Sequence, residues 1–230
     1  MIEHRKFADI TQVDFGWLKA RHHFSFGRYY DPARMGFGTL RVVNDDRIAA
    51  GNGFEKHPHN NMEIITYVRE GEVAHADNLG NKGVTRAGNV QVMSAGTGII
   101  HAEHASPTLP TTLYQIWIVP NKAEVKPRWG QADFPTEPAT TALPLLVSGT
   151  EGEAPLFIHA DAKLWGGTLK AGTAFTQNAG PRAYVLASKG TTVVNGHTLE
   201  EGDSLALLDE GDLDIKATTD AELVVIGLPK

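Results

Sequence analysis

Leu113-Tyr114-Gln115-Ile116-Trp117-Ile118-Val119, which ends at Pro120, is the stretch of this chain that most clearly decides the fold class. Its β-branched and aromatic residues favour a strand, and the proline removes the backbone donor that a continuing ladder would need. Helical periodicity is scarce, whereas strand-like runs recur along the whole chain, at 39–43, 63–68, 90–93, 164–169, 183–187, 204–208 and 221–226. We therefore predict an all-β protein.

Glycine turns separate these runs at short intervals: Glu70-Gly71, Ala87-Gly88, Lys189-Gly190, Asn195-Gly196, Glu201-Gly202 and Glu210-Gly211. Asn195-Gly196 is the strongest hairpin signal, because a type I′ turn needs a positive φ at both central residues. Many short strands at such spacing are typical of a sandwich or a barrel.

The pattern changes between residues 120 and 156, where prolines interrupt it repeatedly: Pro120, Pro127, Pro135, Pro138, Pro144 and Pro155. We interpret this segment as the connection between two β domains, one at 1–135 and one at 136–230. The two halves share an order of strand, glycine turn, strand and polar-glycine turn, which is a weak internal repeat. Only the first half contains a His-x-His pair, so we expect a metal in the first domain alone.

Composition excludes several classes of function. The 230 residues are 41% hydrophobic and 21% charged, as in a globular protein with a real core. The formal net charge of −6, without a basic patch, argues against direct contact with nucleic acid. No signal peptide and no apolar run of membrane-spanning length are visible, so we expect a cytoplasmic protein without membrane contact. Cysteine is absent, which excludes disulfides, thiolate ligands and cysteine nucleophiles.

His57-Pro58-His59 and His101-Ala102-Glu103 are spaced to close on one metal ion. On a strand, residues i and i+2 point to the same face, so two such pairs on facing strands can converge. The glycine-bracketed 94–98 segment provides the tight turn that would bring His101 back towards the first pair. Three imidazoles and one carboxylate leave positions open, which is typical of a catalytic metal rather than a structural one.

Spacing alone does not choose the fourth ligand. Glu63 shares parity with the first histidine pair, and Glu103 shares parity with His101. The alternative role for Glu63 is a carboxylate that orients a histidine. The remaining histidines lack a partner at ligand spacing, and we assign them no direct role: His4, His22, His23, His75, His104, His159 and His197.

The donor set narrows the metal only loosely. Imidazole and carboxylate without sulfur suit Fe(II), Mn(II), Co(II), Ni(II), Cu(II) or Zn(II). Two histidines and a carboxylate are the usual face of non-haem iron oxygenases, and this shell adds one imidazole to it. We therefore predict one divalent transition metal, with Fe(II) as the first candidate, and an oxygenase rather than a hydrolase.

These residues resemble the pirin family of the cupin superfamily. The resemblance rests on His57-Pro58-His59 with Glu63, on Met93 through Glu103, and on the runs at 23–32 and 40–46. It covers most of residues 16–120, whereas the C-terminal half is only loosely similar. Ser94 stands where the germin type of cupin motif has proline, a position at which pirins generally depart from it too.

The resemblance implies a bicupin of two antiparallel β-barrel (jelly-roll) domains packed together, with metal in the N-terminal one only. It implies the ligands His57, His59, His101 and Glu103, which favours Glu103 over Glu63. Bacterial members are quercetin 2,3-dioxygenases, so it also implies a flavonol substrate, O2 and release of carbon monoxide. Glu103 would then act as catalytic base towards the flavonol 3-hydroxyl.

The sequence is also compatible with two other kinds of function. Eukaryotic pirins are nuclear transcription cofactors, so this chain can also be interpreted as a non-catalytic, metal-bound redox sensor or a regulatory module that binds a protein partner. A cupin isomerase or sugar-binding enzyme would need a basic residue at the pocket mouth, for which Lys56 and Arg69 are weak candidates. Turnover of a flavonol separates the enzyme from the sensor.

Overall fold

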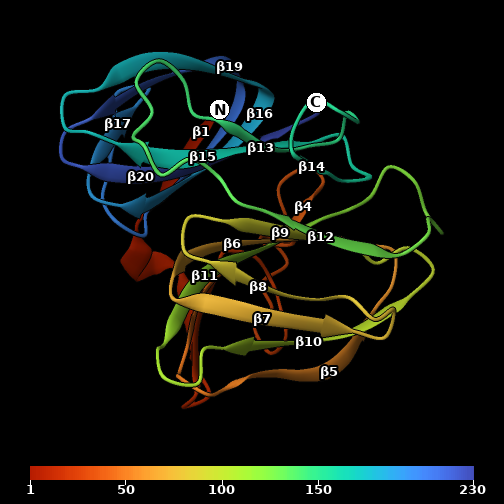
Figure 1. Cartoon of the computed structure of the whole chain (residues 1–230). Coiled ribbons are helices and arrows are strands. Elements are labelled where there is room, and N and C mark those ends of the chain that lie inside the picture. The colour runs from red at the N-terminus through yellow and green to blue at the C-terminus, as the bar shows by residue number, and fades with distance from the viewer. The chain divides into compact units, whose positions relative to one another are not determined.

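The computed structural model describes residues 1–230 and contains twenty strands and one 3₁₀ helix, η1 (Phe7–Asp9) (Figure 1). The chain forms two compact units. The N-terminal unit consists of Thr11–Phe134 with Pro155–Ala160, and the C-terminal unit consists of Met1–Ile10, Pro135–Ala154 and Asp161–Lys230. No helix in the chain has the length and apolar character needed to cross a membrane.

The N-terminal unit is built from two antiparallel sheets. The larger has the order β12-β9-β6-β11-β4-β3-β2, and the smaller has the order β5-β10-β7-β8. The larger sheet contains β2 (Thr11–Asp14), β3 (Leu18–His22), β4 (Leu40–Ile48), β6 (Glu63–Glu70), β9 (Val90–Ser94), β11 (Thr111–Ile118) and β12 (Arg128–Ala132). The smaller contains β5 (Gly53–His59), β7 (Glu72–Asp77), β8 (Lys82–Arg86) and β10 (Ile99–Ala105). β14 (Leu156–Phe157) lies in the returning segment of this unit.

The interior of the N-terminal unit alternates apolar and polar layers. One apolar cluster contains Leu18, Ala20, Ile48, Val68, Val73, Ala105 and Leu113, and another contains Ile64, Met93, Ala95 and Ile99. A row of polar side chains crosses the larger sheet in register, with Asn44 opposite Gln115, Gln115 opposite Thr66 and Thr66 opposite Gln91. Buried polar groups need hydrogen-bond partners. This row can therefore provide such partners for a polar side chain that enters the interior from the smaller sheet.

The C-terminal unit contains a sheet with the order β13-β15-β20-β16-β19-β17-β18, and β1 pairs with β19. Its strands are β1 (Ile2–Arg5), β13 (Leu145–Ser148), β15 (Lys163–Leu169), β16 (Ala174–Lys189), β17 (Thr192–Val194), β18 (His197–Leu199), β19 (Ser204–Ala217) and β20 (Ala221–Leu228). Its core is a continuous apolar cluster that includes Leu199, Leu205, Leu213, Leu223 and Val225. The groups of residues that could hold a metal all lie in the N-terminal unit.

Two turn predictions had different outcomes. The Asn195-Gly196 hairpin is confirmed, because these residues join β17 to β18 and have φ values of 46° and 80°. The expected turn at Glu210-Gly211 is wrong, since β19 continues through it. Positive φ at Asp209 and Gly211, and at Gly180 on β16, bends both strands together at a β-bulge, so the pairing shifts register without ending.

Residues 1–10 fall within the predicted N-terminal domain, yet they lie in the C-terminal unit. β1 pairs along β19, from Ile2 opposite Leu207 to Arg5 opposite Ser204. Asp203, which is 3% exposed, holds the end of this strand: its carboxylate accepts hydrogen bonds from Lys6 Nζ at 2.9 Å and Phe7 N at 2.8 Å. This pairing covers part of β19, which explains why a segment so distant in sequence joins this unit.

Asp203→Asn is expected to destabilise the protein at pH 7 by about 1–3 kcal/mol, because it removes charge-assisted hydrogen bonds from a buried site. Burial raises the pKa of Asp203, but the bonds from Lys6, Phe7 and His4 outweigh it, so the pKa lies below its usual value. A carboxyl group whose pKa is lower in the folded than in the unfolded protein adds stability at pH values above its unfolded pKa. This stabilisation is lost as the pH falls through its folded pKa. The difference between wild type and variant in urea unfolding should therefore shrink below about pH 4.

Asp220→Asn is the matched control for Asp203. Its carboxylate also bonds a lysine, Lys170, but the pair is solvent-exposed and should add little to stability. A pH-independent effect at Asp203, or equal effects at both sites, would contradict the assignment.

Candidate metal centre

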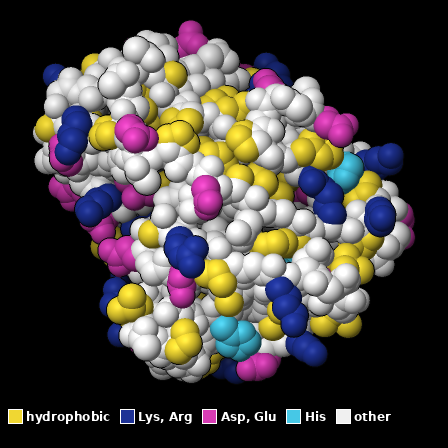
Figure 2. Space-filling model, in the orientation of Figure 1, with side chains coloured by type: hydrophobic (Ala, Val, Ile, Leu, Met, Phe, Trp, Pro, Cys, Tyr) yellow, Lys and Arg dark blue, Asp and Glu magenta, His cyan; other side chains and the backbone are white.

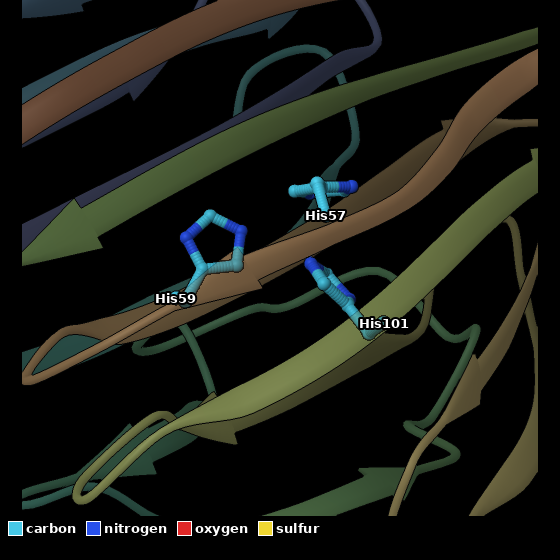
Figure 3. Close-up of side chains that lie close together, drawn as sticks. All are labelled: His57, His59 and His101. Atoms are coloured by element: carbon cyan, nitrogen blue, oxygen red, sulfur yellow. The ribbon is translucent and has the colours of Figure 1, made fainter.

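β5 and β10 pair antiparallel and bring three histidines together (Figure 3). His57 lies opposite His101, and His59 lies opposite Ile99. The ring centroids are 4.4 Å apart for His57 and His101, 4.9 Å for His59 and His101, and 4.9 Å for His57 and His59. One nitrogen of each ring lies within 4.8 Å of the others, so the predicted His-x-His and His101 do converge.

Hydrogen bonds within the protein occupy only some of the ring nitrogens in this cluster, so others can ligate a metal ion. His57 Nδ1 lies 2.7 Å from the carbonyl oxygen of Glu55, which can only accept, so Nδ1 donates this hydrogen bond and Nε2 is the nitrogen left to ligate an ion. His101 is 2% exposed, and its Nε2 is buried without a hydrogen-bond partner. A buried polar atom without a partner is uncommon in folded proteins, and an ion is one explanation for it.

Two of the three imidazoles, His59 and His101, are uncharged at neutral pH. Burial, followed by the neighbouring His57, lowers the pKa of His59 to about 4. Burial, followed by His57, His59 and His75, lowers the pKa of His101 to about 3. Neutral imidazole is the form that ligates metal, so the residues present fit a divalent transition metal.

Glu103 is buried near His101 and held by neutral donors. Gln91 Nε2 donates to Oε1 at 2.5 Å, Gln115 Nε2 donates to Oε2 at 2.9 Å, and Thr66 Oγ1 lies 3.4 Å from Oε1. All three donors belong to the polar row of the larger sheet. Burial raises the pKa of Glu103 to about 7, and these hydrogen bonds moderate the rise. The side chain can thus hold or release a proton near neutral pH.

The turn between β9 and β10 delivers His101 to the cluster. Gly96 has a φ of 46°, and a Cβ there would lie 1.9 Å from the carbonyl oxygen of Val125. Thr97 N also donates to that oxygen at 3.0 Å, so the turn is anchored to the segment after β11. Only glycine fits this close approach.

Gly96→Ala is expected to destabilise the protein by more than about 2 kcal/mol, because left-handed strain and a backbone clash add together. Such a loss corresponds to a fall in Tm of roughly 4–8 °C for a chain of this size. Gly88→Ala is the control, since Gly88 has a φ of 82° but a Cβ added there would meet nothing within 4 Å. Calorimetry should show a clearly larger loss for Gly96→Ala, and equal losses would mean that the clash is relieved without cost.

Comparison with known proteins decides the family. The pirin family model matches residues 4–118, and a model described as the quercetinase C-terminal cupin domain matches residues 145–228. The chain belongs to the pirin family. The expected fold is confirmed as well, since this pirin is nearly all-β and antiparallel with two cupin domains.

Several relatives match this pirin over their full length. A pirin-like protein of Caulobacter vibrioides is 47% identical over 98% of this chain and 99% of its own. Quercetin 2,3-dioxygenase of Escherichia coli K12 is 42% identical over 100% of this chain and 99% of its own. The crystal structure of the E. coli bacterial pirin YhhW in complex with nickel(II) superposes with a TM-score of 0.92 at 41% identity, covering 100% of this chain and 99% of that one.

The two candidate carboxylates lie in different surroundings in this pirin. Glu103 forms an overlapping group with His101 and His75, whose ligand atoms also lie within 4.8 Å of one another. Glu63 belongs to neither group, and its Oε2 accepts a hydrogen bond from Ser94 Oγ at 2.8 Å. The geometry therefore favours Glu103 as the carboxylate beside the histidines, although its group of converging atoms contains His101 and His75 and not His57 or His59.

The sequence interpretation misses two residues at this site, His75 and Trp117. His75 receives no direct role from spacing alone, yet its Nδ1 lies 3.4 Å from Nδ1 of His101. The available signal is His75-Ala76-Asp77, a further i, i+2 pair of potential ligands. Trp117 contacts His59 edge-on at 4.9 Å, and its buried Nε1 has no hydrogen-bond partner.

Proposed function

We propose that this pirin is a metal-dependent dioxygenase that opens the heterocyclic ring of quercetin-like flavonols with O2 and releases carbon monoxide. The observation that carries the proposal is the convergence of three imidazoles, His57, His59 and His101, with the buried carboxylate of Glu103 near His101. Full-length similarity to a protein named quercetin 2,3-dioxygenase supports the reaction class. Each turnover would consume one O2 and one flavonol and release one CO with the ring-opened product.

His57, His59, His101 and Glu103 would hold one divalent metal. The nickel(II) complex of the E. coli pirin supports a divalent ion, and the donor set accepts Fe(II), Ni(II) and several others. When bound, the ion supplies Lewis acidity and open positions for oxygen donors. The Glu55 carbonyl occupies Nδ1 of His57, so Nε2 would be the nitrogen of that ring that binds the ion.

Glu103 would remove the proton from the flavonol 3-hydroxyl. Its pKa of about 7 suits a general base at neutral pH. Gln91 and Gln115 hold one carboxylate oxygen each, which fixes the side chain and stabilises its charged form. A flavonol deprotonated at this oxygen becomes electron-rich, which is the state in which its ring reacts with O2.

The surroundings suit a flat, partly apolar molecule. A cavity of ≈ 550 Å³ is lined by His57 together with Trp17 and Phe54, and its size lies within the range of small-molecule sites. Trp117 contacts both His59 and Phe26, which places aromatic surface next to the histidines. Charges of both signs are interspersed on the face drawn in Figure 2, without a broad basic area.

Aerobic quercetin consumption with detection of CO tests the proposal, using protein whose metal content has been measured in the same sample. We expect O2-dependent loss of quercetin with one CO per flavonol. If the protein contains metal but does not consume quercetin, the dioxygenase proposal is refuted. A metal-bound sensor or regulatory module is then the better interpretation. The cytoplasmic location stays a prediction.

A further inference from the structure

A line of buried groups runs behind the metal centre, from His101 to His75 and on to Asp77. β7 lies beside β10, with His75 opposite Glu103 and Asp77 opposite His101. His101 Nδ1 lies 3.4 Å from His75 Nδ1, and His75 Nε2 lies 3.1 Å from Asp77 Oδ2. The side chains of His75 and Asp77 are both 0% exposed.

We propose that His75 and Asp77 are positioning residues that set the tautomer of His101, so that its Nε2 lone pair faces the metal. This inference rests on the proposed metal site, but it concerns residues that the ligand set does not include. Neither side chain would touch substrate or metal.

The direction of the hydrogen bonds follows from the acceptor at the end of the line. An ionised carboxylate can only accept, so His75 Nε2 must carry a proton. A buried, neutral His75 then has no proton on Nδ1, which must accept from His101 Nδ1–H. His101 is left with a lone pair on Nε2, the atom that has no partner within the protein. A ligating histidine that donates its other ring N–H is the usual arrangement around protein-bound metals.

The far end of the line is itself rigid. Asp77 Oδ1 accepts from Leu79 N at 2.9 Å and from Asn81 N at 3.0 Å, and Oδ2 accepts from Asn81 Nδ2 at 2.8 Å. The His75 ring is stacked on Trp129, with centroids 4.7 Å apart and an interplanar angle of 10°. Both the position of the carboxylate and the plane of the ring are therefore fixed before any ion binds.

Asp77→Asn tests the inference because it keeps the shape and changes one acceptor into a donor. The two backbone N–H groups at Oδ1 require the amide oxygen there, so the NH2 group faces His75 Nε2. His75 then protonates on Nδ1, His101 accepts at Nδ1, and the proton of His101 moves to Nε2. We expect Ni(II) affinity to fall about 10–100-fold in chelator competition. Long-range ¹H–¹⁵N spectra of the metal-free protein should show His101 changing from the Nδ1–H to the Nε2–H tautomer.

His75→Phe is the second variant, since it keeps the stack on Trp129 and removes the hydrogen bond. It should also weaken Ni(II) binding and leave His101 as a mixture of tautomers. Asp45→Asn is the matched control: its carboxylate bonds Arg69 at 2.7 Å, and it should lose stability without losing Ni(II) affinity.

Two results would overturn the inference: an Nε2–H tautomer of His101 in the wild type, or Asp77→Asn that keeps the Nδ1–H tautomer and binds Ni(II) within about twofold of wild type. Failure of the wild type to bind Ni(II) would instead refute the proposed metal site. The tautomer spectra test the inference on the metal-free protein. Failure of the inference can therefore be distinguished from failure of the proposed metal site.

Discussion

His101→Ala is expected to abolish stable metal binding and to reduce flavonol turnover to the background rate. His101 is the residue common to both groups of converging ligands, and its Nε2 is buried without a hydrogen-bond partner. Loss of this imidazole removes one of three nitrogen donors and leaves two histidines from a single strand. We expect Ni(II) affinity to fall by more than about 100-fold, beyond the roughly 10–100-fold loss typical of groups that only orient a ligand.

The control for His101→Ala lies three residues along the same strand. His104 is about one-third exposed at its side chain and lies near Glu55 at 3.3 Å, outside the converging groups. His104→Ala should retain metal content close to that of wild type, and it controls for metal binding only, because His104 lines the ≈ 550 Å³ cavity beside His57. Metal analysis and circular dichroism on both variants separate loss of the site from loss of the fold. Full metal content in His101→Ala would refute the site.

Glu103→Gln is expected to lower kcat by about 10²–10⁴-fold, the usual contribution of a positioned general base. The variant keeps the volume of the side chain but cannot accept a proton from the flavonol. Its amide must also meet the NH2 groups of Gln91 and Gln115, so one of these donors loses its acceptor. Metal content should fall less than in His101→Ala, because the three imidazoles remain.

Glu63→Gln is the matched control for the second prediction. Glu63 is also fully buried in the same unit, but its carboxylate bonds Ser94 and lies outside both converging groups. Its turnover and metal content should stay near those of wild type after correction for the folded fraction. Steady-state kinetics on metal-analysed samples provide both numbers. Full turnover with retained metal in Glu103→Gln would show that Glu103 is not the general base. Loss of metal in Glu63→Gln alone would instead identify Glu63, and not Glu103, as the carboxylate ligand.

The strands and the histidine pairs could be predicted because their signals are local. Alternation, turn glycines and i, i+2 spacing indicate the strands β5, β6, β9, β10 and β11, and the converging histidines follow from that parity. The bend in β19 could not be predicted, because Glu210-Gly211 has the same composition whether a chain reverses or continues through a bulge.

What the sequence could not indicate depends on which strands become neighbours. His75 and Asp77 reach His101 only because β7 pairs with β10 in a particular register, and nothing in their local sequence specifies that partner. The donors around Glu103 come from β6, β9 and β11, so they share a row only after the larger sheet has formed. The position of β1 beside β19 likewise depends on contacts across almost the whole chain.

An anomalous-difference map from crystals of the Ni(II)-loaded protein tests the central claim most directly. We predict a single strong peak in the N-terminal unit, about 2.0–2.2 Å from one nitrogen each of His57, His59 and His101 and from one oxygen of Glu103. A peak among His75, His101 and Glu103 that excludes His57 and His59, or the absence of any peak at the three histidines, would contradict it.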